Sequence, residues 1–197
     1  SGVFVVEAEL DGSRVKARTV EPLTVRAATL REGTKVLVDR VTVSMKPRID
    51  YTATRVVAEI ESLGISTPDG DTLTGVLSAD VALGGAAPAT AFAAQLQGKL
   101  SSLVKPYLPG EVGALTLGLS AKGRHEGNTL QLAALRFRVD RDGGDVLASV
   151  EALQALTVDL TKMQASVPDG TMPAARVKWG GIPLAWAEPY VAQSKLS

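Results

Sequence analysis

The chain has 197 residues, contains no cysteine, and balances 21 Lys and Arg against 21 Asp and Glu. This balance argues against a nucleic-acid-binding protein, which normally presents a basic face, and the lack of cysteine excludes disulfides and thiolate metal sites. No apolar run approaches the roughly 20 residues of a transmembrane helix. We expect one β-rich domain over residues 1–197, excised from a longer protein because neither end resembles a natural boundary.

The N-terminal part predicts strands joined by tight turns. Turn residues at 11–13 and 31–34 separate segments of alternating apolar residues, which is typical of hairpins. The Val-rich strand that follows changes phase at Asp39, which indicates a bulge or a bend. We expect Pro47 to end that strand. Residues 49–63 then predict one further strand, although their apolar spacing would also fit a helix.

Residues 88–108 are the long segment in which the spacing predicts a helix. Pro88 suits the first helical turn, and Pro106 marks the end. An amphipathic helix needs a surface to cover, so the sequence predicts an α+β fold, mainly antiparallel β, with a long meander of hairpins packed on this helix. Residues 182–193 could form a short second helix. The apolar stripe of the main helix consists of Phe92, Leu96, Leu100, Leu103, Val104 and Tyr107.

The C-terminal part also alternates with the period of strands. Residues 73–83 give the clearest strand pattern, and residues 115–121 give another. We expect the polar residues 122–128 to form a turn, with His125 solvated in it. A further hairpin turn is expected at 140–145, and Trp179 is expected in the strand that closes the sheet.

No group of residues forms a convincing active site. Acidic residues within 140–151 resemble a calcium loop, but Gly144 and Asp145 stand where a ligand and a glycine are needed, so a hairpin turn is expected. The S-x-x-K sequence at 102–105 lacks the companion motifs of penicillin-binding enzymes. We therefore expect no enzyme, no catalytic residue, no cofactor and no metal site.

Two interpretations fit the apolar residues of the central strands and of the predicted helix. These residues form a closed core, or helix and sheet together line an apolar groove for a lipid chain. The residues expected to line such a groove are Leu77, Ala79, Val81, Leu83, Phe92, Leu96, Leu100, Leu115, Leu117 and Leu119.

Three segments share a cadence of small and apolar residues around glycines: LSADVALGG at 77–85, LTLGLSAKG at 115–123 and GNTLQLAALRF at 127–137. In this cadence, residues 73–160 resemble the AsmA-like superfamily of the Gram-negative cell envelope, which includes AsmA, TamB and YdbH. The resemblance implies a long, curved antiparallel sheet with an apolar inner face, in a periplasmic protein anchored to the inner membrane. It implies phospholipid conduction in outer-membrane biogenesis and no catalytic residues. The expected mid-chain helix departs from that pattern.

The sequence therefore predicts a non-enzymatic envelope segment that binds or conducts lipid. Its expected partners are phospholipid or fatty acid and neighbouring segments of the same parent chain, with no nucleic acid. The alternative is a structural or protein-interaction β domain without a ligand. A hydrolase is a third reading, which lacks a paired nucleophile and base.

Overall fold

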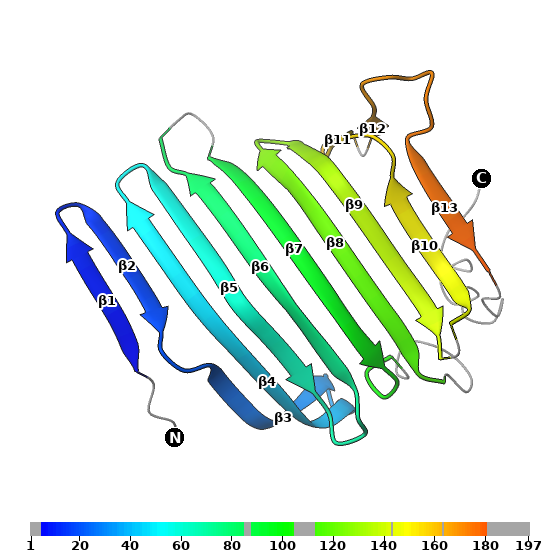
Figure 1. Cartoon of the computed structure of the whole chain (residues 1–197), viewed down its shortest axis with the longest axis horizontal. Helices are drawn as coiled ribbons and strands as arrows, with labels where there is room; N and C mark the ends of the chain where they lie inside the picture. The colour runs from blue at the N-terminus through cyan, green and yellow to red at the C-terminus, as the bar shows by residue number, and fades with distance from the viewer. Residues whose placement is uncertain (1–4, 85–87, 105–112, 143, 163, 181–197) are drawn as a thin grey trace.

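A single curved antiparallel sheet makes up the described part of the protein (Figure 1). The computed structural model describes residues 5–84, 88–104, 113–142, 144–162 and 164–180, and for 27, 28, 30, 32, 35 and 37 only the backbone is described. Ten strands follow the order β1-β2-β4-β5-β6-β7-β8-β9-β10-β13, while β3 pairs with β4, and β11 pairs with β9 and β12. The strands are β1 (Val6–Asp11), β2 (Arg14–Thr19), β3 (Leu23–Glu32), β4 (Lys35–Thr52), β5 (Arg55–Ser66), β6 (Thr72–Ala82), β7 (Ala89–Leu100), β8 (Leu115–Glu126), β9 (Thr129–Arg141), β10 (Val146–Ala152), β11 (Leu156–Asp159), β12 (Gln164–Ser166) and β13 (Ala175–Trp179).

The predicted helix over 88–108 is wrong, and with it the α+β fold class, because the described residues contain strands and no helix. Residues 89–100 form β7, and 101–104 form a turn. A spacing of four fits the helical period and is also a multiple of the strand period of two, so Phe92, Leu96 and Leu100 fall on one face of a strand. Gly98 would also be unfavourable in the interior of a helix. Residues 105–108 and the second predicted helix at 182–193 lie outside the described residues.

Several turns also differ from expectation. Residues 49–63 are not one strand, because a turn at 53–54 divides them between β4 and β5. Pro47 does not end its strand: it lies inside β4 opposite Ile60, where the register shifts between Lys46 and Pro47. The expected bulge near Asp39 is confirmed, since Arg40 has φ 54° and the β3–β4 register shifts there.

The polar segment 122–128 is a turn only at its end. β8 continues to Glu126, and Gly127, with φ 56°, forms the turn with Asn128. His125 is therefore a strand residue opposite Thr90 and Leu130, and not a turn residue. The strand prediction at 73–83 is confirmed as β6, and Trp179 lies in β13, which ends the strand order.

The strand register separates the side chains into two opposite faces. Directly opposed residues of neighbouring strands lie on the same face, and Leu119 is opposed by Leu96 on one side and Phe137 on the other. We call this side the apolar face. It carries Val6, Ala8, Leu10, Val15, Ala17, Val43, Met45, Ile49, Tyr51, Val56, Ala58, Ile60, Leu63, Ile65, Leu73, Leu77, Ala79, Val81, Phe92, Ala94, Leu96, Leu117, Leu119, Ala121, Leu130, Leu132, Leu135, Phe137, Val139, Ala148, Val150, Val177 and Trp179.

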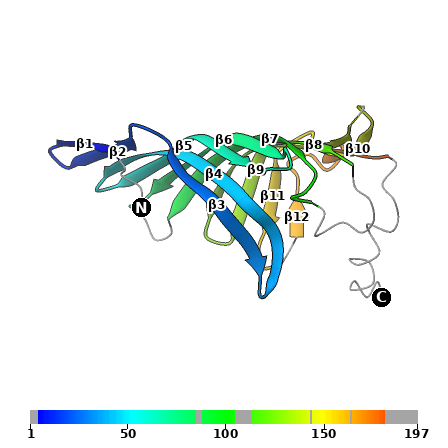
Figure 2. The same cartoon turned by 90° about the horizontal axis from the view of Figure 1, so that it is seen from below.

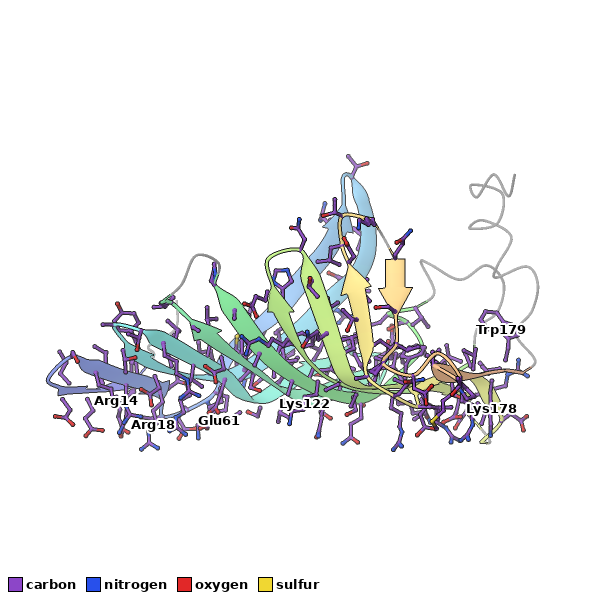
Figure 3. All side chains as sticks on the ribbon, turned by 90° about the horizontal axis from the view of Figure 1, so that it is seen from above. Arg14, Arg18, Glu61, Lys122, Lys178 and Trp179 are labelled. Atoms are coloured by element: carbon purple, nitrogen blue, oxygen red, sulfur yellow. The ribbon has the colours of Figure 1, made fainter. Side chains whose placement is uncertain are left out.

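The opposite side, which we call the charged face, carries most of the ionic residues of the sheet. Figure 3 shows Arg14, Arg18, Glu61, Lys122 and Lys178 projecting to this side, and Trp179 projecting to the other. The β3–β4 and β11–β12 hairpins both extend from the apolar side of the sheet (Figure 2). The sheet is thus a curved, two-faced layer whose apolar side is flanked by two hairpins.

Few side chains in this layer are fully buried. The buried hydrophobic residues are Val38, Val41, Leu100, Leu115 and Leu147. Leu115 and Leu147 form a small cluster with Val104 and Val139 packed against it. The chain exposes 13098 Å² of surface, whereas a compact monomer of 20.5 kDa exposes about 8,800 Å². A one-layer sheet accounts for part of this excess, because no second layer of described residues covers the apolar face.

Candidate functional site

The ten residues predicted to line a groove lie close together on three adjacent strands. Leu77, Ala79 and Val81 come from β6, Phe92 and Leu96 from β7, and Leu117 and Leu119 from β8, and the register places all of them on the apolar face. Leu83 follows the end of β6 and is 44% exposed. Leu100 and Leu115 oppose each other at the end of β7 and β8, where both are buried. Seven of the ten thus share one half-exposed surface, and two belong to the core.

The apolar face is wider than the sequence predicted. It continues across β5 through Ile60 and Leu63, and across β9 through Leu135 and Phe137. Its exposure rises toward both sides of the sheet, from half-buried at Leu119 to 67% at Trp179. The sequence predicted this lining from one helix and two strands only. Extending the period of two across 56–65 and 130–139 would have found the remainder.

Three glycines make the central apolar face smooth. Gly75, Gly98 and Gly123 each lie opposite a large residue of the next strand: Leu96, Leu73 and Phe92, respectively. A Cβ at Gly123 would lie 2.7 Å from Cζ of Phe92 and 2.4 Å from the backbone oxygen of Gln131. The missing side chain therefore lets the large neighbour lie across the glycine. The resulting surface is apolar and low in relief, and it lies on paired antiparallel strands.

An acidic side chain fixes one end of this face. Asp71, 2% exposed, follows β5 and accepts hydrogen bonds from the backbone N–H of Ser101 (2.7 Å), the backbone N–H of Leu103 (2.6 Å) and the hydroxyl of Ser102 (2.8 Å). Burial alone would raise the pKa of Asp71, but these donors outweigh it and lower the pKa below its usual range. The carboxylate thereby holds residues 101–104 against the sheet, and Val104 reaches the Leu115–Leu147 cluster. The sequence around Asp71, TPDGD at 67–71, indicates only a turn.

The charged face holds cross-strand ion pairs. Arg55 Nε lies 2.7 Å from Asp80 Oδ1 across β5 and β6, and Arg14 pairs with Asp50 across β2 and β4. These arginine hydrogen bonds lower the pKa of Asp50 and of Asp80 below the usual range. The side chains are partly exposed, so the pairs keep this face hydrated and contribute little stability.

A shallow hollow of about 680 Å³ lies on the charged face across β5 to β9. Gly118 forms part of its floor, and a Cβ there would meet nothing within 4 Å. Thr74, Gln95, Gln97 and Ser120 are among its polar lining residues. This hollow has no nucleophile paired with a base. Among the described residues, no group of three or more His, Cys, Asp and Glu could hold a metal ion.

The described residues include no helix long and apolar enough to cross a membrane. No family model, no curated protein and no solved structure matches this chain. The resemblance to AsmA-like proteins therefore stays a prediction.

Proposed function

We propose that this chain is a non-enzymatic lipid-binding segment whose apolar face holds the acyl chains of phospholipid or fatty acid. The observation that carries the proposal is an apolar face that none of the described elements covers, which lies opposite a charged face and extends across neighbouring strands. Exposed apolar patches of monomers rarely exceed a few hundred Å², and larger ones mark interaction sites.

The dimensions of the face suit an extended hydrocarbon chain. β7 has 12 residues, which corresponds to about 40 Å of strand, longer than the roughly 15 Å depth of one bilayer leaflet. Each fully buried methylene contributes about 0.8 kcal/mol, and a methylene that lies on an open face contributes part of this. The lipid headgroup needs no dedicated site in this arrangement, because it can remain in water beside the hairpins.

The proposed location is the periplasm, in an envelope protein. This part of the proposal rests only on the resemblance to the AsmA-like superfamily. The competing function is a structural β domain whose apolar face is covered by protein and binds no ligand. The two functions differ in what occupies the same side chains, so one measurement separates them.

The first measurement is solvent extraction of protein purified without detergent, with mass spectrometry of the extract. Phospholipid or fatty acid at near-stoichiometric amounts supports the lipid-binding function. A blank extract from a folded sample, together with no binding of a fluorescent fatty acid, contradicts it and favours the structural domain.

A pair of variants on one strand links any bound lipid to the apolar face. Leu117→Asp places a charge on the apolar face, and Ser120→Asp places the same charge on the charged face of β8. Leu117→Asp should abolish lipid retention, and Ser120→Asp should retain it, with thermal melting as the check on folding. Equal lipid retention in both variants would show that the lipid lies elsewhere.

A further inference from the structure

The two outermost strands of the sheet have unpaired outer edges within the described chain. β1 and β13 stand at opposite ends of the strand order, as Figure 1 shows. Val20 N–H donates to Val5 C=O, and in the alternating antiparallel pattern this directs the backbone groups of Val6, Ala8 and Leu10 away from β2. Such an edge is a template for another strand.

The two edges carry opposite charges. On the charged face, β1 presents Glu7 and Glu9, and β13 presents Arg176 and Lys178. Opposite charges on directly opposed strand positions stabilise a sheet, whereas like charges destabilise it. The acidic edge is thus complementary to the basic edge, and neither is complementary to itself.

The same arrangement of charges already occurs inside the sheet. Glu151 of β10 lies between Arg136 of β9, at 2.6 Å, and Arg176 of β13, at 3.6 Å. At the β1 edge, Glu7 pairs with Arg18 at 2.8 Å on its inner side. A basic strand on the outer side of β1 would complete for Glu7 the two-sided pairing that Glu151 has.

The directions of the two edge strands, and the sides to which their faces point, are also compatible with joining β1 of one copy to β13 of another. The strand order from β1 to β13 contains ten strands, both ends included, and all neighbours in it are antiparallel. Because this number is even, β1 and β13 run in opposite directions. A copy placed next to another in the same orientation therefore sets β1 antiparallel to β13, with both apolar faces on the same side. The antiparallel alternation continues without interruption across the junction.

In one register between β1 and β13, every side chain of the shorter strand, β13, lies opposite a side chain of complementary charge or matching polarity. Placing Lys178 opposite Glu7 puts Arg176 opposite Glu9, and it sets Val177 opposite Ala8. The same register opposes Trp179 to Val6 and Ala175 to Leu10. Val6, Leu10, Val177 and Trp179 are 57%, 77%, 63% and 67% exposed, among the most exposed large apolar side chains of the sheet, and the junction covers them.

We propose that a second copy of this chain pairs its β1 strand with β13, head to tail, and extends the sheet. The contact uses two different surfaces, so each added copy leaves one edge of each kind free and assembly continues beyond a dimer. The apolar faces join into one longer face. This inference does not depend on lipid binding.

The test is the mass of the full chain by sedimentation velocity over a wide concentration range. We expect species that grow beyond dimers with concentration and diminish as salt is added. Glu7→Lys with Glu9→Lys should abolish association, and so should Arg176→Glu with Lys178→Glu. Mixing these two charge-reversed proteins should restore it, because each then supplies the edge that the other needs. Glu59→Lys with Glu61→Lys changes the net charge equally in β5 and should leave association intact.

Two further variants keep the test independent of the ion pairs. Ala8→Pro removes an outward N–H from the β1 edge and should prevent association. The chain has no cysteine, so Ala8→Cys with Val177→Cys should yield a covalent ladder on oxidation, since opposed Cα atoms lie within disulfide reach. A chain that stays monomeric, a closed dimer, or association unchanged by both charge reversals would overturn the proposal.

Discussion

Two regions of the apolar side differ in how they exclude water. At one end, which we call the sealed end, hydrogen bonds to Asp71 hold residues 101–104 against the sheet, and Leu147 is 2% exposed. In the open stretch, across the middle of β5 to β9, side chains such as Leu117 are half-buried, and no described element covers them. The same kinds of residue are present in both regions. The difference teaches that the open stretch is exposed because no described element lies over it, and not because its side chains are less apolar.

The largest effect should come from damage to the sealed end. Leu147→Ala removes a fully buried side chain and should lower the free energy of unfolding by about 4 kcal/mol. Leu117→Ala, the matched truncation in the open stretch, should cost about 1 kcal/mol because its side chain is already partly in water. Urea denaturation of both variants measures the comparison. Equal losses would mean that the open stretch is packed as a core in solution.

The next effect concerns the carboxylate that holds the sealed end. Asp71→Asn should lower the free energy of unfolding by about 2 kcal/mol, because buried N–H donors lose a charged acceptor. The exposed Asp69→Asn, two residues earlier, is the control and should be nearly neutral.

The pH dependence of Asp71 follows from the direction of its shift. Its pKa is lowered in the folded protein, so its stabilisation is present above the unfolded pKa of about 3.9 and is lost as pH falls through the folded value. The difference in melting temperature between wild type and Asp71→Asn should therefore be constant near neutrality and shrink in acid. A difference that grows in acid would contradict this role.

An effect of similar size tests the glycines in the floor of the open stretch. Gly98→Ala places a Cβ 2.2 Å from the backbone oxygen of Thr72, and relieving this overlap should cost about 2 kcal/mol. Gly118→Ala, on the charged face with nothing within 4 Å, should be neutral or should stabilise by about 0.5 kcal/mol. Chemical denaturation of the two glycine variants gives the comparison, and similar values would show that the strands do not approach as described.

The smallest effect should come from the charged face behind the open stretch. Arg55→Gln breaks the pair with Asp80, and because both side chains are partly exposed, the unfolding midpoint should move only slightly, and less at high salt. A thermal melt at two salt concentrations measures this. A shift as large as that of Asp71→Asn would mean that the pair is shielded from water.

The sequence predicted the strands better than it predicted what covers them. The alternation of 73–83 identified β6 because large apolar and polar residues occupy successive positions. The prediction of a helix at 88–108 failed because the alanines at 91, 93 and 94 hide the alternation of apolar and polar residues. The large apolar residues that remain are four positions apart, which also fits a helix. Asp71 could not be recognised from sequence, since its partners lie 30 or more positions away. Nor could local periodicity distinguish core from open surface, because half-buried and buried strands share the same period.

The even number of strands along the described path from β1 to β13 has a consequence for how such a protein could change in length. Consecutive strands are mostly also neighbours in the sheet, so inserting or deleting one hairpin adds or removes two strands at once. Direction and facing of everything beyond the insertion are then preserved, whereas a single-strand insertion would reverse the direction of all later strands. The hairpin is therefore the unit by which gene duplication could lengthen or shorten this sheet without disturbing the separation of its faces.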